Sequence, residues 1–168
     1  MASAALPMLF HAVEIDGVPY WDGGYMGNPA ILPFLHATDA EDLLVVQINP
    51  TMRKTMPRTS PQIIDRLNEI TFNSALISEF RAMDFVNQLI DDGRLPHHYR
   101  RLNIHRIDLG TLGNRLSGSS KMKADFEFFE LLFRAGQRAA RKFLERHFDD
   151  LGHRSTIDLA AESCVEWA

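Results

Sequence analysis

The apolar positions in the first part of the chain predict a hairpin followed by a buried strand. Residues 13–15 and 18–21 are short apolar and aromatic runs on either side of Asp16-Gly17, which is a strong hairpin signal. Pro19 cannot donate to a strand ladder, so we expect the second arm at an edge or a bulge. Residues 43–48 form a continuous apolar run, which is typical of a strand covered on both faces in a parallel sheet.

Two proline-containing caps predict helices in the middle of the chain. Asn28-Pro29 favours a short helix that runs through Ile31 and Leu32. Ser60-Pro61 begins a long helical period that ends at Gly93. Because globular helices usually span about 8 to 20 residues, we expect this period to break near residues 71–73.

The last third of the chain completes an alternation of strands and helices. Residues 103–109 alternate polar and apolar side chains and predict a half-buried strand. After a loop at residues 112–123, residues 124–148 predict a final helix. We expect its apolar stripe to pack in the core rather than on a membrane, and this stripe includes Phe129, Leu132, Phe133, Ala140, Phe143 and Leu144. The order of elements favours an α/β fold whose sheet is at least partly parallel.

Composition and charge narrow the class of protein. A chain of 168 residues fits one domain, and its net charge of -4 gives no reason to expect a nucleic-acid partner. Cys164 is a single cysteine and cannot form an internal disulfide. The sequence has neither an apolar run long enough for a transmembrane segment nor a basic signal-peptide start, so we expect a cytoplasmic protein.

The motif search finds no metal or cofactor site and no serine nucleophile. His97-His98 is expected to face solvent, and surface or capping roles are expected for His11, His36, His105, His147 and His153. Likewise, the basic residues Arg53, Lys54 and Arg58 are expected in a solvated loop. No Gly-x-Ser-x-Gly elbow is present. Ser119 and Ser120 follow a glycine, but they are expected to open the last helix rather than to act as nucleophiles.

Asp22-Gly23-Gly24, at the end of the second hairpin arm, has two interpretations. Aspartate and glycine are common in tight turns, and the residue types alone favour an ordinary turn. Alternatively, the glycines let the backbone pass close to another group while Asp22 projects from the end of a strand, where the catalytic groups of α/β sheets gather. An unrelated α/β domain with a coincidental turn remains an alternative.

The order of these motifs resembles the C-terminal half of patatin-like phospholipases. The resemblance rests on the small-residue segment at residues 2–7, the hairpin, Tyr20-Trp21-Asp22-Gly23-Gly24 and Asn28-Pro29, and it extends to about Ala161. It implies a three-layer α/β/α fold, incomplete here, with long C-terminal helices. It further implies a lipid acyl hydrolase of phospholipase A or esterase type with a Ser-Asp dyad. Asp22 matches the catalytic aspartate, supported by Gly23 and Gly24.

The chain departs from this family in one important respect. The nucleophile elbow and the oxyanion loop precede this region in the family, and neither is present here. A carboxylate activates a serine only within hydrogen-bond reach, about 2.6 to 3.2 Å. We therefore interpret residues 1–162 as the C-terminal part of a truncated patatin-like domain that is inactive alone. Residues 163–168 do not continue the helical pattern and are interpreted as a non-native tail.

Two functions follow from this interpretation. The first is a hydrolase of lipids or small esters to which this chain contributes the acid, with no cofactor. The alternative is a non-catalytic lipid- or protein-binding module derived from the same fold. A strand such as residues 43–48 needs neighbours on both sides, so we also expect self-association through exposed sheet edges.

Overall fold

The computed structural model describes all residues except 8, 35–37, 54, 117–119, 121–122 and 164–168. Its strands are β1 (Val13–Ile15), β2 (Val18–Tyr20), β3 (Asp42–Gln47) and β4 (Asn103–Asp108). Its α-helices are α2 (Ser60–Asp91), α3 (Phe126–His147) and α4 (Leu159–Ser163). Short 3-10 turns are η1 (Ala2–Ala4), η2 (Gly23–Tyr25), η3 (Gly113–Arg115) and η5 (Phe148–Asp150).

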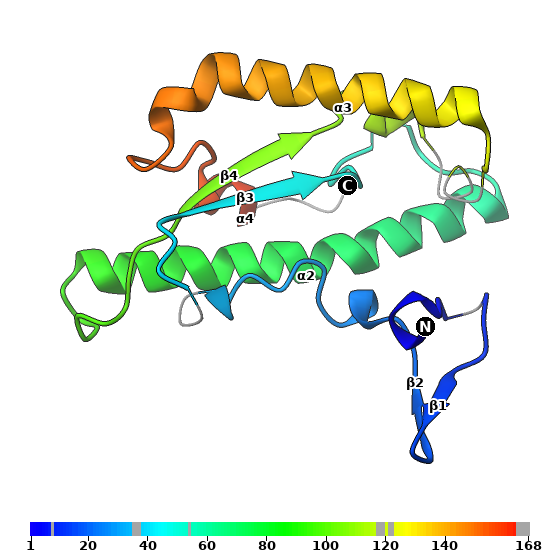
Figure 1. Cartoon of the computed structure of the whole chain (residues 1–168), viewed down its shortest axis with the longest axis horizontal. Helices are drawn as coiled ribbons and strands as arrows, with labels where there is room; N and C mark the ends of the chain where they lie inside the picture. The colour runs from blue at the N-terminus through cyan, green and yellow to red at the C-terminus, as the bar shows by residue number, and fades with distance from the viewer. Residues whose placement is uncertain (8, 35–37, 54, 117–119, 121–122, 164–168) are drawn as a thin grey trace.

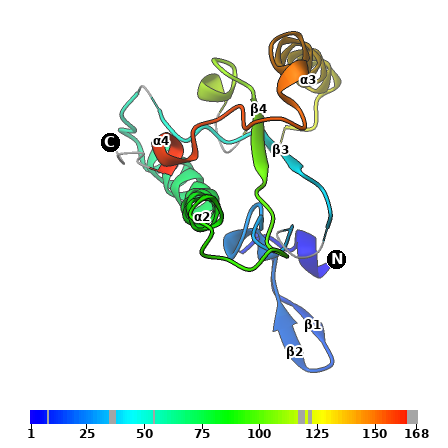
Figure 2. The same cartoon turned by 90° about the vertical axis from the view of Figure 1, so that its left-hand side faces the viewer.

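The architecture is α/β, built on one parallel strand pair. β3 and β4 run side by side in the same direction, with Asp42 opposite Asn103 and Gln47 opposite Asp108. α2 makes the crossover between them, as parallel strands require. In Figure 1 the pair lies between α2 and α3, and Figure 2 shows the hairpin of β1 and β2 projecting away from it. The sequence expectation of an α/β fold with a partly parallel sheet is confirmed.

The core fills the space between α2, α4 and one face of the parallel pair. It consists of Ile31, Val45, Leu76, Phe80, Met83, Leu102, Ile104 and Leu159. Fully burying an aliphatic or aromatic side chain of this size contributes about 1.5 to 3 kcal/mol. The position of α4 beside α2 therefore ties the C-terminal segment to the centre of the fold.

The hairpin and the long helix follow the sequence closely. Asp16 and Gly17 have φ of 52° and 78°, the pair of positive values that a type I′ hairpin turn requires. α2 begins one residue before Pro61 and runs for 32 residues without a break, so the expected interruption near residues 71–73 is wrong. Asn73 is buried there and donates its side-chain amide to the carbonyl of Pro50, so its polar group is satisfied within a continuous helix.

The prediction of a short helix after Asn28-Pro29 is also wrong. Residues 28–33 form bends and a turn. A carboxylate oxygen of Glu79 on α2 accepts the backbone N–H groups of Ile31 at 3.2 Å and Leu32 at 2.8 Å. Because this contact joins residues nearly fifty positions apart, no local pattern could reveal it.

Two apolar surfaces that were expected to be covered are open. On β3, Val45 is buried, but Leu44 and Val46 on the opposite face are 46% and 68% exposed. On α3, Phe143 is buried against the sheet, whereas Phe129, Phe133 and Leu144 are exposed. The expectation that these side chains pack in the core is therefore wrong within the described part of the chain.

Candidate active site

Asp22 lies in a tight turn two residues beyond the end of β2. Its backbone N–H donates to the carbonyl of Ala5 at 2.9 Å, which brings the small-residue segment at the N-terminus beside the Asp-Gly-Gly turn. Oδ1 of Asp22 accepts the N–H of Gly24 at 2.7 Å and so caps η2. The other carboxylate oxygen accepts no hydrogen bond from any described residue. One oxygen thus orients the half-buried side chain and the other is available to a further donor.

The two glycines of this turn have different environments. A Cβ at Gly24 would lie 3.0 Å from Oδ1 of Asp22 and 3.1 Å from Cε1 of Phe72, which is tighter than ordinary van der Waals contact. A Cβ at Gly23 would meet nothing within 4 Å. Gly24 is therefore required by the close approach of Asp22 and α2, whereas Gly23 is not.

An aromatic pair fixes the turn on α2. The rings of Tyr25 and Phe72 are tilted to each other and have centroids 4.9 Å apart, within the separation at which aromatic pairs interact. Phe72 also borders the space beside Gly24, and Nδ2 of Asn28 would lie 3.8 Å from a Cβ placed there. The Asp22 turn is consequently held at a defined place along α2 rather than projecting freely.

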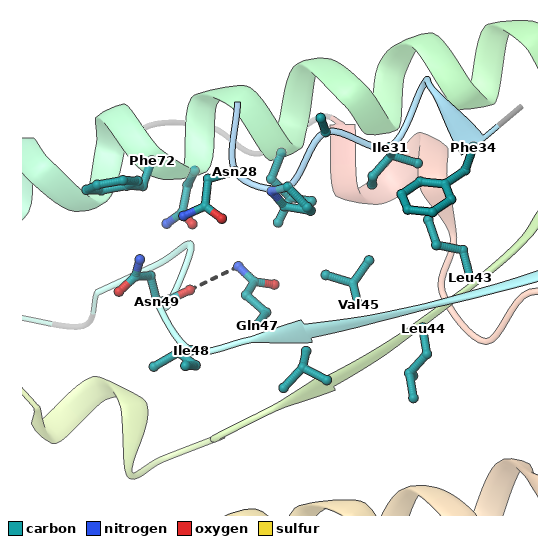
Figure 3. A pocket seen from close by; sticks show the side chains of 15 residues that line it. Asn28, Ile31, Phe34, Leu43, Leu44, Val45, Gln47, Ile48, Asn49 and Phe72 are labelled. Atoms are coloured by element: carbon teal, nitrogen blue, oxygen red, sulfur yellow. Dashed lines mark hydrogen bonds between the residues drawn. The ribbon is translucent and has the colours of Figure 1, made fainter. Parts of the chain in front are cut away.

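A cavity of about 470 Å³ opens next to this turn (Figure 3). It lies between α2, the segment of residues 28–34 and β3. In Figure 3 the amide side chains of Asn28, Gln47 and Asn49 lie toward one end, beside Phe72 and Ile48, and Ile31, Phe34, Leu43 and Val45 lie toward the other. Asn73 and Leu76 of α2 also line the cavity. Because Asn28 and Phe72 line the cavity and also border Gly24, the Asp22 turn adjoins its amide end. The site thus combines a carboxylate, several amides and an apolar compartment.

A second polar cluster lies under α3, around a histidine that is closed to solvent, while the side chain of its partner Asp42 is 28% exposed. His105 on β4 is completely buried; its Nε2 is 2.8 Å from Oδ1 of Asp42 and its Nδ1 is 3.1 Å from Oγ1 of Thr156. A carboxylate only accepts, so Nε2 carries a hydrogen. Desolvation acts to raise the pKa of Asp42, but hydrogen bonds from His105, the Gly152 N–H and Asn103 outweigh it and lower that pKa.

This cluster joins separate parts of the fold. It connects β3, β4 and the segment that leads to α4, and the Phe143 ring from α3 packs against the His105 ring in a T-shaped arrangement. The surface or capping role expected for His105 is therefore wrong. Because the imidazole is inaccessible, we assign the cluster a structural role.

A largely buried ion cluster joins the N-terminal part of α2 to neighbouring loops. Arg53 pairs with Glu69 and also donates to the carbonyls of Asn114 and Leu116 at 2.6 Å, which joins two loops to the helix. Arg66 is 3.4 Å from the same carboxylate. Both arginine side chains are largely buried, so the expectation that Arg53 belongs to a solvated loop is wrong. Lys54 lies outside the described residues.

Several of the remaining candidates lie outside the part of the chain that the structure describes. Ser119, His36 and Cys164 lie outside the described residues, as does the tail beyond Ser163. The structure records no hydrogen bond between Asp22 and any described serine.

Among the described residues, no group of three or more His, Cys, Asp or Glu side chains has the arrangement of a metal site. Nor does any described helix combine the length and apolarity needed to cross a bilayer.

The sequence analysis missed Phe72 and Asn28 as part of this site. The available signal was weak, because Phe72 lies in the apolar period of α2 and Asn28 precedes a proline.

Comparison with known proteins adds no relative: the chain matches no family model, no curated protein and no solved structure.

Proposed function

We propose that this chain is the acid-bearing part of a patatin-like acyl hydrolase that acts on lipids or small esters, with Asp22 as the aspartate of a Ser-Asp dyad. The observation that carries the proposal is the geometry of the Asp22 side chain. Gly24 N–H holds one carboxylate oxygen at 2.7 Å, and no described residue binds the other. A carboxylate oriented in this way can accept the proton of a serine hydroxyl that approaches its second oxygen.

The cavity supports an ester substrate with an apolar chain. Its amide end adjoins the Asp22 turn, and its apolar end extends along β3 toward Phe34. An ester group has oxygen acceptors that suit amide N–H donors, whereas an acyl chain gains from leaving water for an apolar compartment. Under this proposal the fold is the C-terminal part of a three-layer α/β/α domain, and the protein functions in the cytoplasm.

The reaction requires a serine from sequence that precedes this region in the family. In the proposed step, the serine oxygen forms a bond to the ester carbonyl carbon while Asp22 accepts the hydroxyl proton. Collapse of the tetrahedral intermediate then breaks the bond to the leaving alkoxide, which takes up that proton. Water repeats the sequence on the acyl-enzyme and releases the carboxylic acid.

The proposal is tested first by treating the purified chain with a fluorophosphonate probe and measuring its intact mass. We expect no stoichiometric adduct, because Asp22 has no serine partner among the described residues. An adduct on Ser119 or Ser120 would place the nucleophile within this chain and overturn this part of the proposal.

The dyad itself is tested in a polypeptide that contains this sequence together with a Gly-x-Ser-x-Gly segment. Asp22→Asn should lower kcat/KM by about 10²- to 10⁴-fold, the usual contribution of general acid–base catalysis. Asp16→Asn is the matched control, because Asp16 also precedes a glycine but lies in the hairpin turn. Retention of most activity in Asp22→Asn would contradict the assignment.

A non-catalytic lipid-binding module is the second candidate, favoured by the open face of α3. Phe129, Phe133 and Leu144 are exposed, and Arg134, Arg138 and Arg141 lie on the same helix. Apolar side chains with nearby basic groups suit an anionic bilayer surface. Under this function the chain binds phosphatidylserine vesicles in a flotation assay, and Phe133→Ser weakens binding whereas Asp22→Asn does not. If Phe133→Ser binds the vesicles as well as wild type does, α3 does not have this role.

A further inference from the structure

A second cavity, of about 340 Å³, lies at the beginning of α2 and shares no lining residue with the cavity beside Asp22. One wall is a single face of α2, because its members have the i, i+3, i+4 and i+7 spacing of one helix face. They are Gln62, Asp65, Arg66 and Glu69. Two loops form the other walls, with Arg53 and residues 55–57 from one and Arg115 and Leu116 from the other. The volume lies within the range of small-molecule sites, about 300 to 1,000 Å³.

The charges that line this cavity differ in sign from the charge of the whole chain. Arg53, Arg66 and Arg115 contribute three positive charges. Asp65 and Glu69 contribute two negative charges, so the lining has a net formal charge of +1, whereas the chain has -4. The first turn of α2 contains no acidic residue, so the positive end of the helix dipole adds to this potential. The cavity therefore favours an anion over a cation.

The carboxylate of Glu69 is already engaged by two of these arginines. Both of its oxygens accept hydrogen bonds from Arg53, and Oε2 also lies 3.4 Å from Nη1 of Arg66. Arg53 has four of its five N–H groups in recorded hydrogen bonds. Arg66 has only two, to Glu69 and to the carbonyl of Thr51. Within the described part of the chain, three N–H groups of Arg66 therefore have no recorded acceptor.

Arg115 is the third guanidinium group of the lining, and it is exposed. Its side chain has no recorded hydrogen bond or ion pair with any described residue. Like charges that line one cavity repel each other, and this repulsion is relieved when a ligand supplies negative charge. Arg115 and the spare donors of Arg66 thus provide an accessible set of N–H groups, and they surround a space large enough for an anionic molecule.

We propose that this cavity binds a phosphomonoester, whose phosphate group accepts hydrogen bonds from Arg66 and Arg115. A phosphomonoester carries about 1.5 to 2 negative charges at pH 7 and has three strong acceptor oxygens. The planar fork of arginine matches such oxygens through paired N–H groups. Met56, Pro57 and Leu116 supply apolar contact for the organic part of the ligand. The site does not depend on the proposed hydrolase, because the two cavities share no residue.

The test titrates the full chain with phenyl phosphate at low ionic strength in a calorimeter. We expect saturable binding, and Arg115→Ala should weaken it by at least about tenfold, as loss of charge-assisted hydrogen bonds implies. Arg94→Ala is the matched control, because it removes the same charge from an exposed arginine just beyond the other end of α2. A helix of 32 residues spans about 48 Å, well beyond the screening length, so this variant should bind within about threefold of wild type.

A neutral analogue tests the role of charge without any substitution in the protein. Dimethyl phenyl phosphate keeps the phenyl and phosphoryl groups but carries no charge, so it should not bind to the wild-type chain. Binding of this triester as tight as that of phenyl phosphate would overturn the proposal, because the cavity would then recognise only the apolar part of the ligand.

Vesicles that contain phosphatidic acid distinguish the two sources of a phosphomonoester. Flotation of the chain with these vesicles that is lost in Arg115→Ala and kept in Arg94→Ala would identify a lipid headgroup as the ligand. Binding of phenyl phosphate without such flotation would identify a soluble phosphorylated molecule. If neither phenyl phosphate nor the vesicles bind in a manner that depends on Arg115, the proposal is wrong and the arginines of this cavity serve only to join the loops to α2.

Discussion

Nε2 of His105 lies 2.8 Å from Oδ1 of Asp42 and joins the two parallel strands beneath α3. The second oxygen of Asp42 accepts the N–H of Gly152 at 2.8 Å, which holds the segment that leads to α4. Removing this carboxylate should therefore affect the whole fold and not only one loop. The pair is expected to be a principal determinant of stability in this small sheet.

We predict that Asp42→Asn lowers the free energy of unfolding by about 1 to 3 kcal/mol, because asparagine has one acceptor oxygen for the donors His105, Gly152 N–H and Asn103, and so leaves at least one of them unpaired. Urea denaturation followed by circular dichroism measures the change. Asp39→Asn is the control, since Asp39 is almost fully exposed and a surface change of this kind stays within about 0.5 kcal/mol. Equal effects of the two substitutions would contradict the role of Asp42.

The same carboxylate predicts how stability depends on pH. The pKa of Asp42 is lower in the folded protein than its usual value of 3.8, because hydrogen bonds from His105, Gly152 and Asn103 outweigh desolvation. A lowered folded-state pKa means that the stabilisation is fully present above the usual pKa and is lost as pH falls through the folded value. The difference in unfolding free energy between wild type and Asp42→Asn should therefore be constant near neutral pH and shrink below about pH 4. A difference that grows on acidification would show that another group controls it.

The sequence predicted the elements of the fold better than their burial. Asp16-Gly17, the two parallel strands and the limits of α2 follow from local preferences, because turn chemistry and helix caps act over a few residues. The prediction that both faces of β3 and the apolar stripe of α3 are covered was wrong. Periodicity tells which residues share a face, but not whether another element covers that face. Arg53 and His105 were missed because their partners, Glu69 and Asp42, are distant in sequence.

The candidate site was predicted only in part, because some of its contacts also join residues that are distant in sequence. Asp22 and its glycines stand out as a motif, but the sequence cannot distinguish the role of Gly23 from that of Gly24. That distinction comes from Phe72, a residue of α2 that packs against one glycine and not the other. The dyad assignment stays a prediction, since it needs a serine that the described residues do not provide.

Substitution of the two glycines tests the packing of the Asp22 turn. We predict that Gly24→Ala destabilises the protein by about 1 to 3 kcal/mol, because the new Cβ is forced against Asp22 and Phe72. Gly23→Ala meets open space and should change stability by less than about 0.5 kcal/mol. Thermal unfolding of the two variants gives the comparison. If Gly24→Ala is as stable as Gly23→Ala, the turn is not held against α2.

Glu69 provides a sharper test of buried charge. Its carboxylate pairs with both Arg53 and Arg66, whose side chains are 17% and 13% exposed, so Glu69→Gln removes the negative charge recorded against two largely buried guanidinium groups. We predict a loss of about 3 to 5 kcal/mol, the usual cost of removing one partner from a buried ion pair. Glu130→Gln is the matched control, because Glu130 pairs with Arg134 on the exposed side of α3 and such pairs contribute only about 0.3 to 0.5 kcal/mol. Chemical denaturation of both variants should separate them by several kcal/mol. A small effect at Glu69 would mean that solvent reaches Arg53 and Arg66, and that the loops they join open readily from the start of α2.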